Sequence, residues 1–126
     1  MGISPDHVGL IGFSAGGFIT AEVAVQHTSE SRPAFVAVIY GGLNSDTSVP
    51  TDAPPMFIAA ATDDDLGLAP ASIALYQKWT AAQKPAELHM YTKGGHGFGM
   101  RQQNLPTDHW IDRFADWLQL EGFLNK

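Results

Sequence analysis

The sequence predicts an α/β fold, with a parallel sheet of about four strands and flanking helices. Short apolar runs over residues 8–11, 35–40, 55–61 and 87–91 have the length and composition of buried strands. Segments with helical spacing of apolar residues cover 15–27, 70–83 and 108–121. Strands that alternate with helices are typical of parallel sheets joined by crossover connections. The 126 residues contain no repeat and no internal linker, so we expect a single domain over 1–126.

The first predicted strand, residues 8–11, leads directly into Gly12-Phe13-Ser14-Ala15-Gly16-Gly17 and then into a predicted helix. A Gly-x-Ser-x-Gly pattern between a strand and a helix is typical of a nucleophile elbow. Such a turn strains the backbone of the serine, and we expect small residues at Gly12 and Gly16 so that strand and helix can pass closely. A serine before a helix is also a common N-cap, and in that alternative Ser14 has no chemical role.

The later elements follow from the same patterns. The run over 35–40 is uninterrupted, as in a strand buried on both faces, and the polar, proline-containing stretch 44–54 is predicted to be a loop. Proline lies near the start of the helix over 70–83 and again after its end. The inner faces of the last two helices are expected to carry Ile73, Tyr76 and Trp79 in one, and Trp110, Phe114, Trp117 and Leu118 in the other.

Polar residues follow two of the predicted strands. Three adjacent aspartates come after residues 55–61, and His96 lies in a glycine-rich stretch after residues 87–91. The carboxyl ends of parallel strands meet at one edge of a sheet, so we expect these groups to lie near Ser14. A reactive serine needs a base, and the base needs an acid that orients it. The alternatives are a solvated acidic turn and an exposed loop histidine; His7, His27, His89 and His109 are expected to be structural or to lie on the surface.

The motifs resemble those of the α/β-hydrolases of the esterase and dienelactone-hydrolase-like group, which includes acetyl-xylan-esterase-like enzymes. The resemblance is carried by GFSAGG, AAATDDDLGLAP, ELHMYTKGGHGFGM and DHWIDRFADWLQLEGF, which together span nearly the whole chain. These segments correspond to the C-terminal half of such an enzyme. The resemblance therefore implies a partial α/β-hydrolase fold without the usual N-terminal strands.

The resemblance also implies roles for particular residues: Ser14 as nucleophile, His96 as base and the backbone amide of Ala15 as an oxyanion donor. Among the aspartates, Asp63 fits the register of the family acid best, Asp64 second and Asp65 last. In complete members, a glycine-rich loop before the elbow supplies a further oxyanion donor. Its absence from this sequence implies weak activity.

The function implied by the resemblance is hydrolysis of small carboxylic esters through an acyl-enzyme, with no metal or organic cofactor. Two alternatives stay open. One is a peptidase of the prolyl-oligopeptidase kind, which has the same order of triad residues. The other is a non-catalytic or weakly active α/β-hydrolase fragment whose site is vestigial.

Composition restricts the partners. A net charge of -6 with only seven Lys and Arg residues argues against nucleic acid and against anionic membrane surfaces. The absence of cysteine excludes disulfides, thiol catalysis and cysteine-ligated zinc. We find no apolar run of roughly 20 residues and no signal peptide pattern, so a soluble protein, cytoplasmic by default, is expected. The uncharged strand over 8–11 is expected to form an exposed edge, which predicts a homodimer that buries this strand and the last helix.

Overall fold

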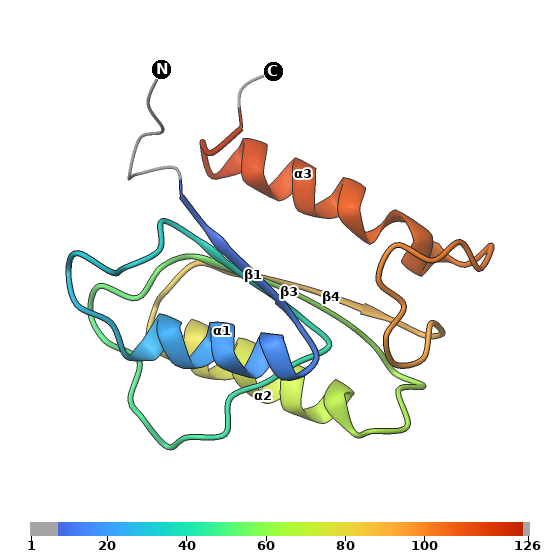
Figure 1. The fold of residues 1–126 in the computed structure, drawn as a ribbon, viewed down its shortest axis with the longest axis horizontal. Coiled ribbons are helices and arrows are strands. Elements are labelled where there is room, and N and C mark those ends of the chain that lie inside the picture. Colours follow the sequence, from blue (N-terminus) through green and yellow to red (C-terminus); the bar gives the residue numbers. More distant parts are fainter. Residues whose placement is uncertain (1–7, 125–126) are drawn as a thin grey trace.

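The computed structural model describes residues 8–124 and contains a four-stranded parallel sheet (Figure 1). The strands are β1 (Leu10–Phe13), β2 (Val36–Ile39), β3 (Met56–Ala61) and β4 (Ala86–Tyr91). They lie side by side in sequence order, and each neighbouring pair is parallel. The predicted fold class is confirmed. The strand β1 begins two residues later than predicted and continues to Phe13, directly before Ser14.

The helices cover both faces of the sheet (Figure 1). Helices α1 (Ala15–Val25) and α2 (Leu68–Ala81) lie on one face, and α3 (Trp110–Leu120), preceded by the 3₁₀ turn η2 (Pro106–His109), lies on the other. Helix α2 accommodates Pro70 in its first turn, where the backbone needs no N–H donor. No helix in the described part of the chain combines the length and the apolar character that crossing a membrane requires.

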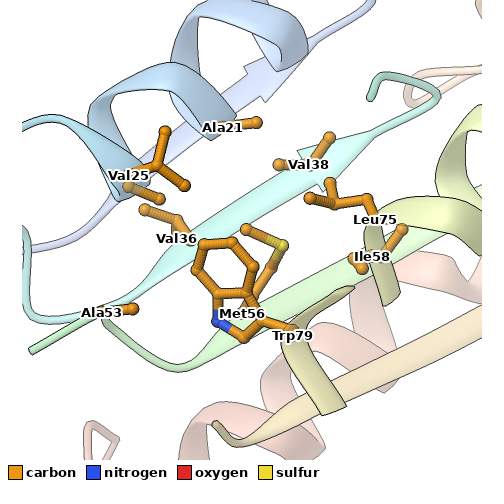
Figure 2. Packing of buried hydrophobic residues seen from close by; sticks show 10 residues of the cluster. Ala21, Val25, Val36, Val38, Ala53, Met56, Ile58, Leu75 and Trp79 are labelled. Carbon is orange, nitrogen blue, oxygen red and sulfur yellow. The ribbon is translucent and has the colours of Figure 1, made fainter. Parts of the chain in front are cut away.

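Two hydrophobic clusters hold the layers together. Alternate residues of β2 and β3 face α1 and α2, where Val36, Val38, Met56 and Ile58 pack with Ala21, Leu75 and Trp79 (Figure 2). The intervening residues face α3, where Ala37, Ile39, Phe57 and Ala59 pack with Trp110, Phe114 and Trp117. Both strands are buried along their full lengths, which explains why they appear in the sequence as uninterrupted apolar runs. The predicted aromatic stripe of α3 is confirmed.

The inner face of α2 differs from the prediction. Trp79 is buried as predicted, but Ile73 is exposed and Tyr76 is only half-buried. Ser72 faces the core instead, because its hydroxyl donates a 2.8 Å hydrogen bond to the backbone oxygen of Gly41. A polar side chain that finds a partner can be buried at little cost, and apolar spacing in a sequence does not reveal that partner.

Candidate active site

Ser14 occupies a strained turn between β1 and α1. Its φ of 56° and ψ of -119° place it in a region that non-glycine residues rarely adopt. The strand side of the turn is fixed because the backbone N–H of Ser14 donates to the oxygen of Ile39 at 3.0 Å. Ser14 occupies the N-cap position of α1, but its side chain makes no hydrogen bond to the helix, which contradicts the alternative that the hydroxyl serves as a cap. The turn therefore leaves the hydroxyl available for another partner.

Gly12 is the glycine that lets the strand and helix approach. A Cβ atom at Gly12 would lie 2.1 Å from the backbone oxygen of Gly16 and 2.3 Å from Oγ1 of Thr20. At Gly16, a Cβ would meet no atom of another element within 4 Å. The expectation that the elbow needs small residues is thus correct for Gly12 and wrong for Gly16, since the close approach occurs on the strand side of the turn.

We expect Gly12→Ala to lower the free energy of unfolding by ~3 kcal/mol, because the added methyl group clashes with backbone that cannot move away. Gly16→Ala is the matched control and should leave stability unchanged or raise it by up to ~1 kcal/mol, since alanine favours helix more than glycine does. Urea unfolding measures both effects. Equal unfolding midpoints for the two variants would contradict this account of the elbow.

A continuous line of hydrogen bonds joins Ser14, His96 and Asp64. Nε2 of His96 lies 2.8 Å from Oγ of Ser14, and Nδ1 lies 2.8 Å from Oδ2 of Asp64. The Asp64 side chain is fully buried, whereas that of His96 is 21% exposed. An ionised carboxylate only accepts hydrogen bonds, so Nδ1 carries the proton that faces Asp64. Nε2 is then left to accept the Ser14 hydroxyl proton.

The structure places Asp64, and not Asp63, against the imidazole. The sequence pattern ranks Asp63 first among the three aspartates, and this ranking is corrected in favour of Asp64. Strand β3 ends at Ala61, and the backbone N–H of Asp64 bonds to the oxygen of Ala61 at 3.2 Å, which turns Asp64 back over the strand end. The second carboxylate oxygen of Asp64 accepts from the N–H of Leu66 at 2.8 Å. Asp63 is exposed and accepts instead from the backbone N–H of Gly95 at 2.7 Å, and Asp65 is also exposed.

Tyr40 is a further residue of the site that the sequence indicated only as the end of a strand. It follows β2 with a φ of 38°, and its ring packs edge-on against His96 with the centroids 4.9 Å apart. Burial raises the pKa of Tyr40, while the backbone N–H of Gly99 and the charge of Arg101 act in the opposite direction. The hydroxyl is therefore neutral at neutral pH. Its position at the carboxyl end of a predicted strand is the sequence signal that could have identified this residue.

Ala15 is exposed and is the first residue of α1. Its backbone N–H has no acceptor within the helix, because the first amides of any helix lack one. The positive end of the helix dipole lies at the same place. A negative charge that develops beside Ser14 would find a hydrogen-bond donor there.

The remaining described histidines have other partners. They are His27, which bonds to Asp52 and to the backbone of Val23, His89, which bonds to Glu87, and His109, which lies 3.5 Å from Asp112. His7 lies outside the described residues. Within residues 8–124, no group of three or more His, Asp or Glu side chains is arranged to hold a metal ion.

An open hollow of about 870 Å³ lies elsewhere, at the amino ends of the strands. Leu10, Ala34 and Pro55, which line it, stand at or just before the starts of β1, β2 and β3. Ser14, Asp64 and His96 lie at the carboxyl ends of the strands. The hollow is therefore separate from the site around Ser14.

Comparisons with known proteins agree with this fold. The model of the dienelactone hydrolase family matches residues 1–123. The comparison with curated protein sequences gives no match. Among solved structures, MGS-M1, an α/β hydrolase enzyme from a Medee basin deep-sea metagenome library, is 27% identical with a TM-score of 0.81, over 92% of this chain and 55% of its own.

Two other solved structures share the fold at lower identity. An acetyl ester-xyloside bifunctional hydrolase from Caldicellulosiruptor lactoaceticus is 22% identical with a TM-score of 0.86, over 98% of this chain and 60% of its own. The carboxylesterase Cest-2923 from Lactobacillus plantarum WCFS1 is 19% identical with a TM-score of 0.81, over 98% of this chain and 62% of its own. The chain thus spans between 55% and 62% of the length of these relatives. With the family model matched over nearly the whole sequence, the chain belongs to the dienelactone hydrolase family, and its sheet is part of an α/β-hydrolase fold.

Proposed function

We propose that the protein is a carboxylic ester hydrolase that acts through an acyl-enzyme on Ser14. The observation that carries the proposal is the line of two 2.8 Å hydrogen bonds from Ser14 through His96 to Asp64. A serine hydroxyl becomes a nucleophile at neutral pH when a base within hydrogen-bond distance removes its proton. The base works when a third group fixes its tautomer and orientation. In this chain the acid is Asp64.

The reaction begins when Oγ of Ser14 attacks the carbonyl carbon of the ester and Nε2 of His96 takes the hydroxyl proton. The carbonyl oxygen becomes an oxyanion, and the backbone N–H of Ala15 donates a hydrogen bond to it. Collapse of this intermediate breaks the ester C–O bond, and the proton on Nε2 passes to the departing alcohol. Water then attacks the acyl group, His96 takes its proton and returns it to Ser14, and the carboxylic acid leaves.

The burial of Asp64 suits this sequence of steps. The imidazole becomes positively charged while it holds the proton, and a carboxylate in contact with Nδ1 stabilises that charge. Asp64 has no exposed side-chain surface, so water competes little for its oxygens. The acid therefore favours the protonated imidazole at the moment when the tetrahedral intermediate exists.

Small acyl esters are the proposed substrates. Two of the solved relatives are by name an acetyl ester-xyloside bifunctional hydrolase and a carboxylesterase, which supports ester cleavage. The site at Ser14 and His96 is only partly covered by the chain, so it can receive a substrate from solvent.

A fluorophosphonate probe together with p-nitrophenyl acetate tests the function. We expect stoichiometric labelling of Ser14, located by peptide mass spectrometry, and hydrolysis of the ester that labelling abolishes. The corresponding p-nitroanilide should be a far poorer substrate, whereas preferred cleavage of the amide would favour a peptidase. A folded protein that neither reacts with the probe nor cleaves the ester would refute the proposal and favour a vestigial site.

We also propose that a second copy of the chain covers the free edge of β1. Within residues 8–124 this strand pairs with β2 on one side only, and Leu10, Ile11 and Phe13 are each more than a third exposed. Residues 8–21 contain no Asp, Glu, Lys or Arg, so two copies can meet there without repulsion although the chain carries a net charge of -6. An apolar, uncharged strand edge pairs readily with another strand, and a two-fold axis lets the same edge serve both copies.

The dimer should dissociate when a charge is placed on this edge. We expect the 126-residue chain to sediment as a dimer at micromolar concentration and Ile11→Lys to sediment as a monomer. The dimer would bury the lysine of each copy in the interface without a partner of opposite charge, which is unfavourable. Ile73→Lys is the control, since Ile73 is 39% exposed on α2 and Ile11 is 41% exposed on β1. A monomeric parent protein, or a dimer that survives Ile11→Lys, would overturn this proposal.

A further inference from the structure

His96, the base of the proposed triad, lies in a glycine-rich segment whose own sequence does not favour a single conformation. We name residues 94–99 the His96 loop; its sequence is Gly-Gly-His-Gly-Phe-Gly. Gly95, Gly97 and Gly99 have positive φ values of 71°, 74° and 45°. Glycine loses more conformational freedom on folding than any other residue, so this loop needs contacts from outside to stay in one conformation.

Asp63 supplies such a contact on one side of His96. Its Oδ1 accepts a 2.7 Å hydrogen bond from the backbone N–H of Gly95, the residue directly before the histidine. The next residue, Asp64, bonds to the imidazole itself. Two adjacent carboxylates at the end of β3 thus hold the backbone and the side chain of the same short segment.

Tyr40 supplies the contact on the other side. Its ring centroid lies 4.9 Å from that of His96 and 4.9 Å from that of Phe98, with edge-on geometry in both cases. Tyr40 is buried, and its positive φ is strained for an aromatic residue. Strain of this kind persists where the surrounding structure fixes it, and it is concentrated at functional sites.

The far end of the loop is anchored as well. The indole N–H of Trp110, the first residue of α3, donates a 2.7 Å hydrogen bond to the backbone oxygen of Gly99. Trp110 is buried in the cluster between the sheet and α3, so this anchor belongs to the core. The segment between Gly95 and Gly99 is therefore held at both ends while His96 faces Ser14.

We propose that Asp63 and Tyr40 are positioning residues, which hold the His96 loop from two sides so that Nε2 stays within hydrogen-bond distance of Ser14 before substrate binds. Neither residue is assigned a contact with the substrate. The inference rests on the proposed function, because positioning matters to catalysis only if His96 is the base. The contacts of Asp63 and Tyr40 keep the His96 imidazole from moving away from Ser14. A displacement of about 1 Å at a catalytic group can lower a rate by about 100-fold.

Asp63 is tested by comparing alanine with asparagine. Asp63→Ala removes the acceptor for Gly95 N–H and should lower kcat on p-nitrophenyl acetate by about 10-fold to 100-fold with KM unchanged. Asp63→Asn keeps a side-chain oxygen that can accept the same bond, so its kcat should stay within about 3-fold of the parent value. Asp65→Ala, at the neighbouring exposed carboxylate, should leave kcat unchanged. Equal losses for Asp63→Ala and Asp63→Asn would overturn the role of the hydrogen bond.

Tyr40 is tested by separating its ring from its hydroxyl. Tyr40→Phe keeps the edge contact with His96 and loses only the interaction of the hydroxyl with the backbone N–H of Gly99, a residue that Trp110 also holds, so it should retain kcat within about 3-fold. Tyr40→Leu should lower kcat by about 10-fold to 100-fold at constant KM. Tyr91→Leu, which alters a half-buried tyrosine of β4, controls for a general loss of packing. A Tyr40→Leu variant with parental kcat would overturn the role of the ring.

A readout that is independent of activity completes the test. The proton on Nδ1 of His96 should give a low-field NMR signal that is sharp in the parent and in Asp63→Asn, Tyr40→Phe and Asp65→Ala. The signal should broaden or disappear in Asp63→Ala and Tyr40→Leu although their thermal unfolding stays cooperative. If these signals behave as expected but the parent does not react with the fluorophosphonate, the proposed function fails and the positioning of His96 stands. If the signal stayed sharp in both Asp63→Ala and Tyr40→Leu, the proposal that Asp63 and Tyr40 position His96 would be refuted.

Discussion

Ser14→Ala and His96→Ala are each expected to lower kcat on short acyl esters by about 10⁵ to 10⁶-fold. Either change removes the 2.8 Å contact through which the imidazole takes the hydroxyl proton. The nucleophile and base act as one unit, so the double variant should be no slower than either single variant. Steady-state kinetics with p-nitrophenyl acetate measure all three proteins.

The controls for this prediction are a serine and a histidine away from the site. Ser29→Ala and His109→Ala alter exposed side chains and should keep the parental kcat. Circular dichroism and thermal unfolding should show that Ser14→Ala is folded, since the Ser14 side chain makes no capping bond to α1. Ester hydrolysis that persists at the parental rate in purified Ser14→Ala would end the case for an acyl-enzyme at this residue.

The elbow and the sheet could be predicted from the sequence because their signals are local. A strand, a Gly-x-Ser-x-Gly turn and a helix follow one another without interruption, so the position of Ser14 is set by its immediate neighbours. The buried strands β2 and β3 are continuous apolar runs, and parallel order then brings His96 and the aspartates to the same edge. Long, regular patterns of this kind depend little on tertiary detail.

The choice among the aspartates could not be made in this way. Asp63 and Asp64 have the same side chain and differ by one position in a turn, where each residue points in a new direction. The bond from Asp64 N–H to the oxygen of Ala61 sets that direction, and nothing in the composition of the segment specifies it. The role of Tyr40 in the site could not be predicted for a similar reason, because its contact with His96 joins residues that are far apart in the sequence.

Asp64 makes two hydrogen bonds that an asparagine cannot both replace. One oxygen accepts from Nδ1–H of His96, and the other accepts from the backbone N–H of Leu66. An asparagine has one oxygen and one NH₂ group, so one of the two donors must face another donor. When the oxygen stays with Leu66, the NH₂ group faces Nδ1 and forces the imidazole proton onto Nε2, where it blocks the transfer from Ser14.

Asp64→Asn is therefore expected to lower kcat by about 10⁴-fold with little change in KM, since the tautomer and not the substrate contact is altered. Asp63→Asn, one residue earlier, should stay within about 3-fold of the parent, because a single oxygen satisfies its single donor, Gly95 N–H. Parallel kcat measurements on the two isosteric variants decide which carboxylate is the acid. If Asp63→Asn proved the more damaging change, the acid would be Asp63, and the hydrogen bond between Asp64 and His96 would serve structure alone.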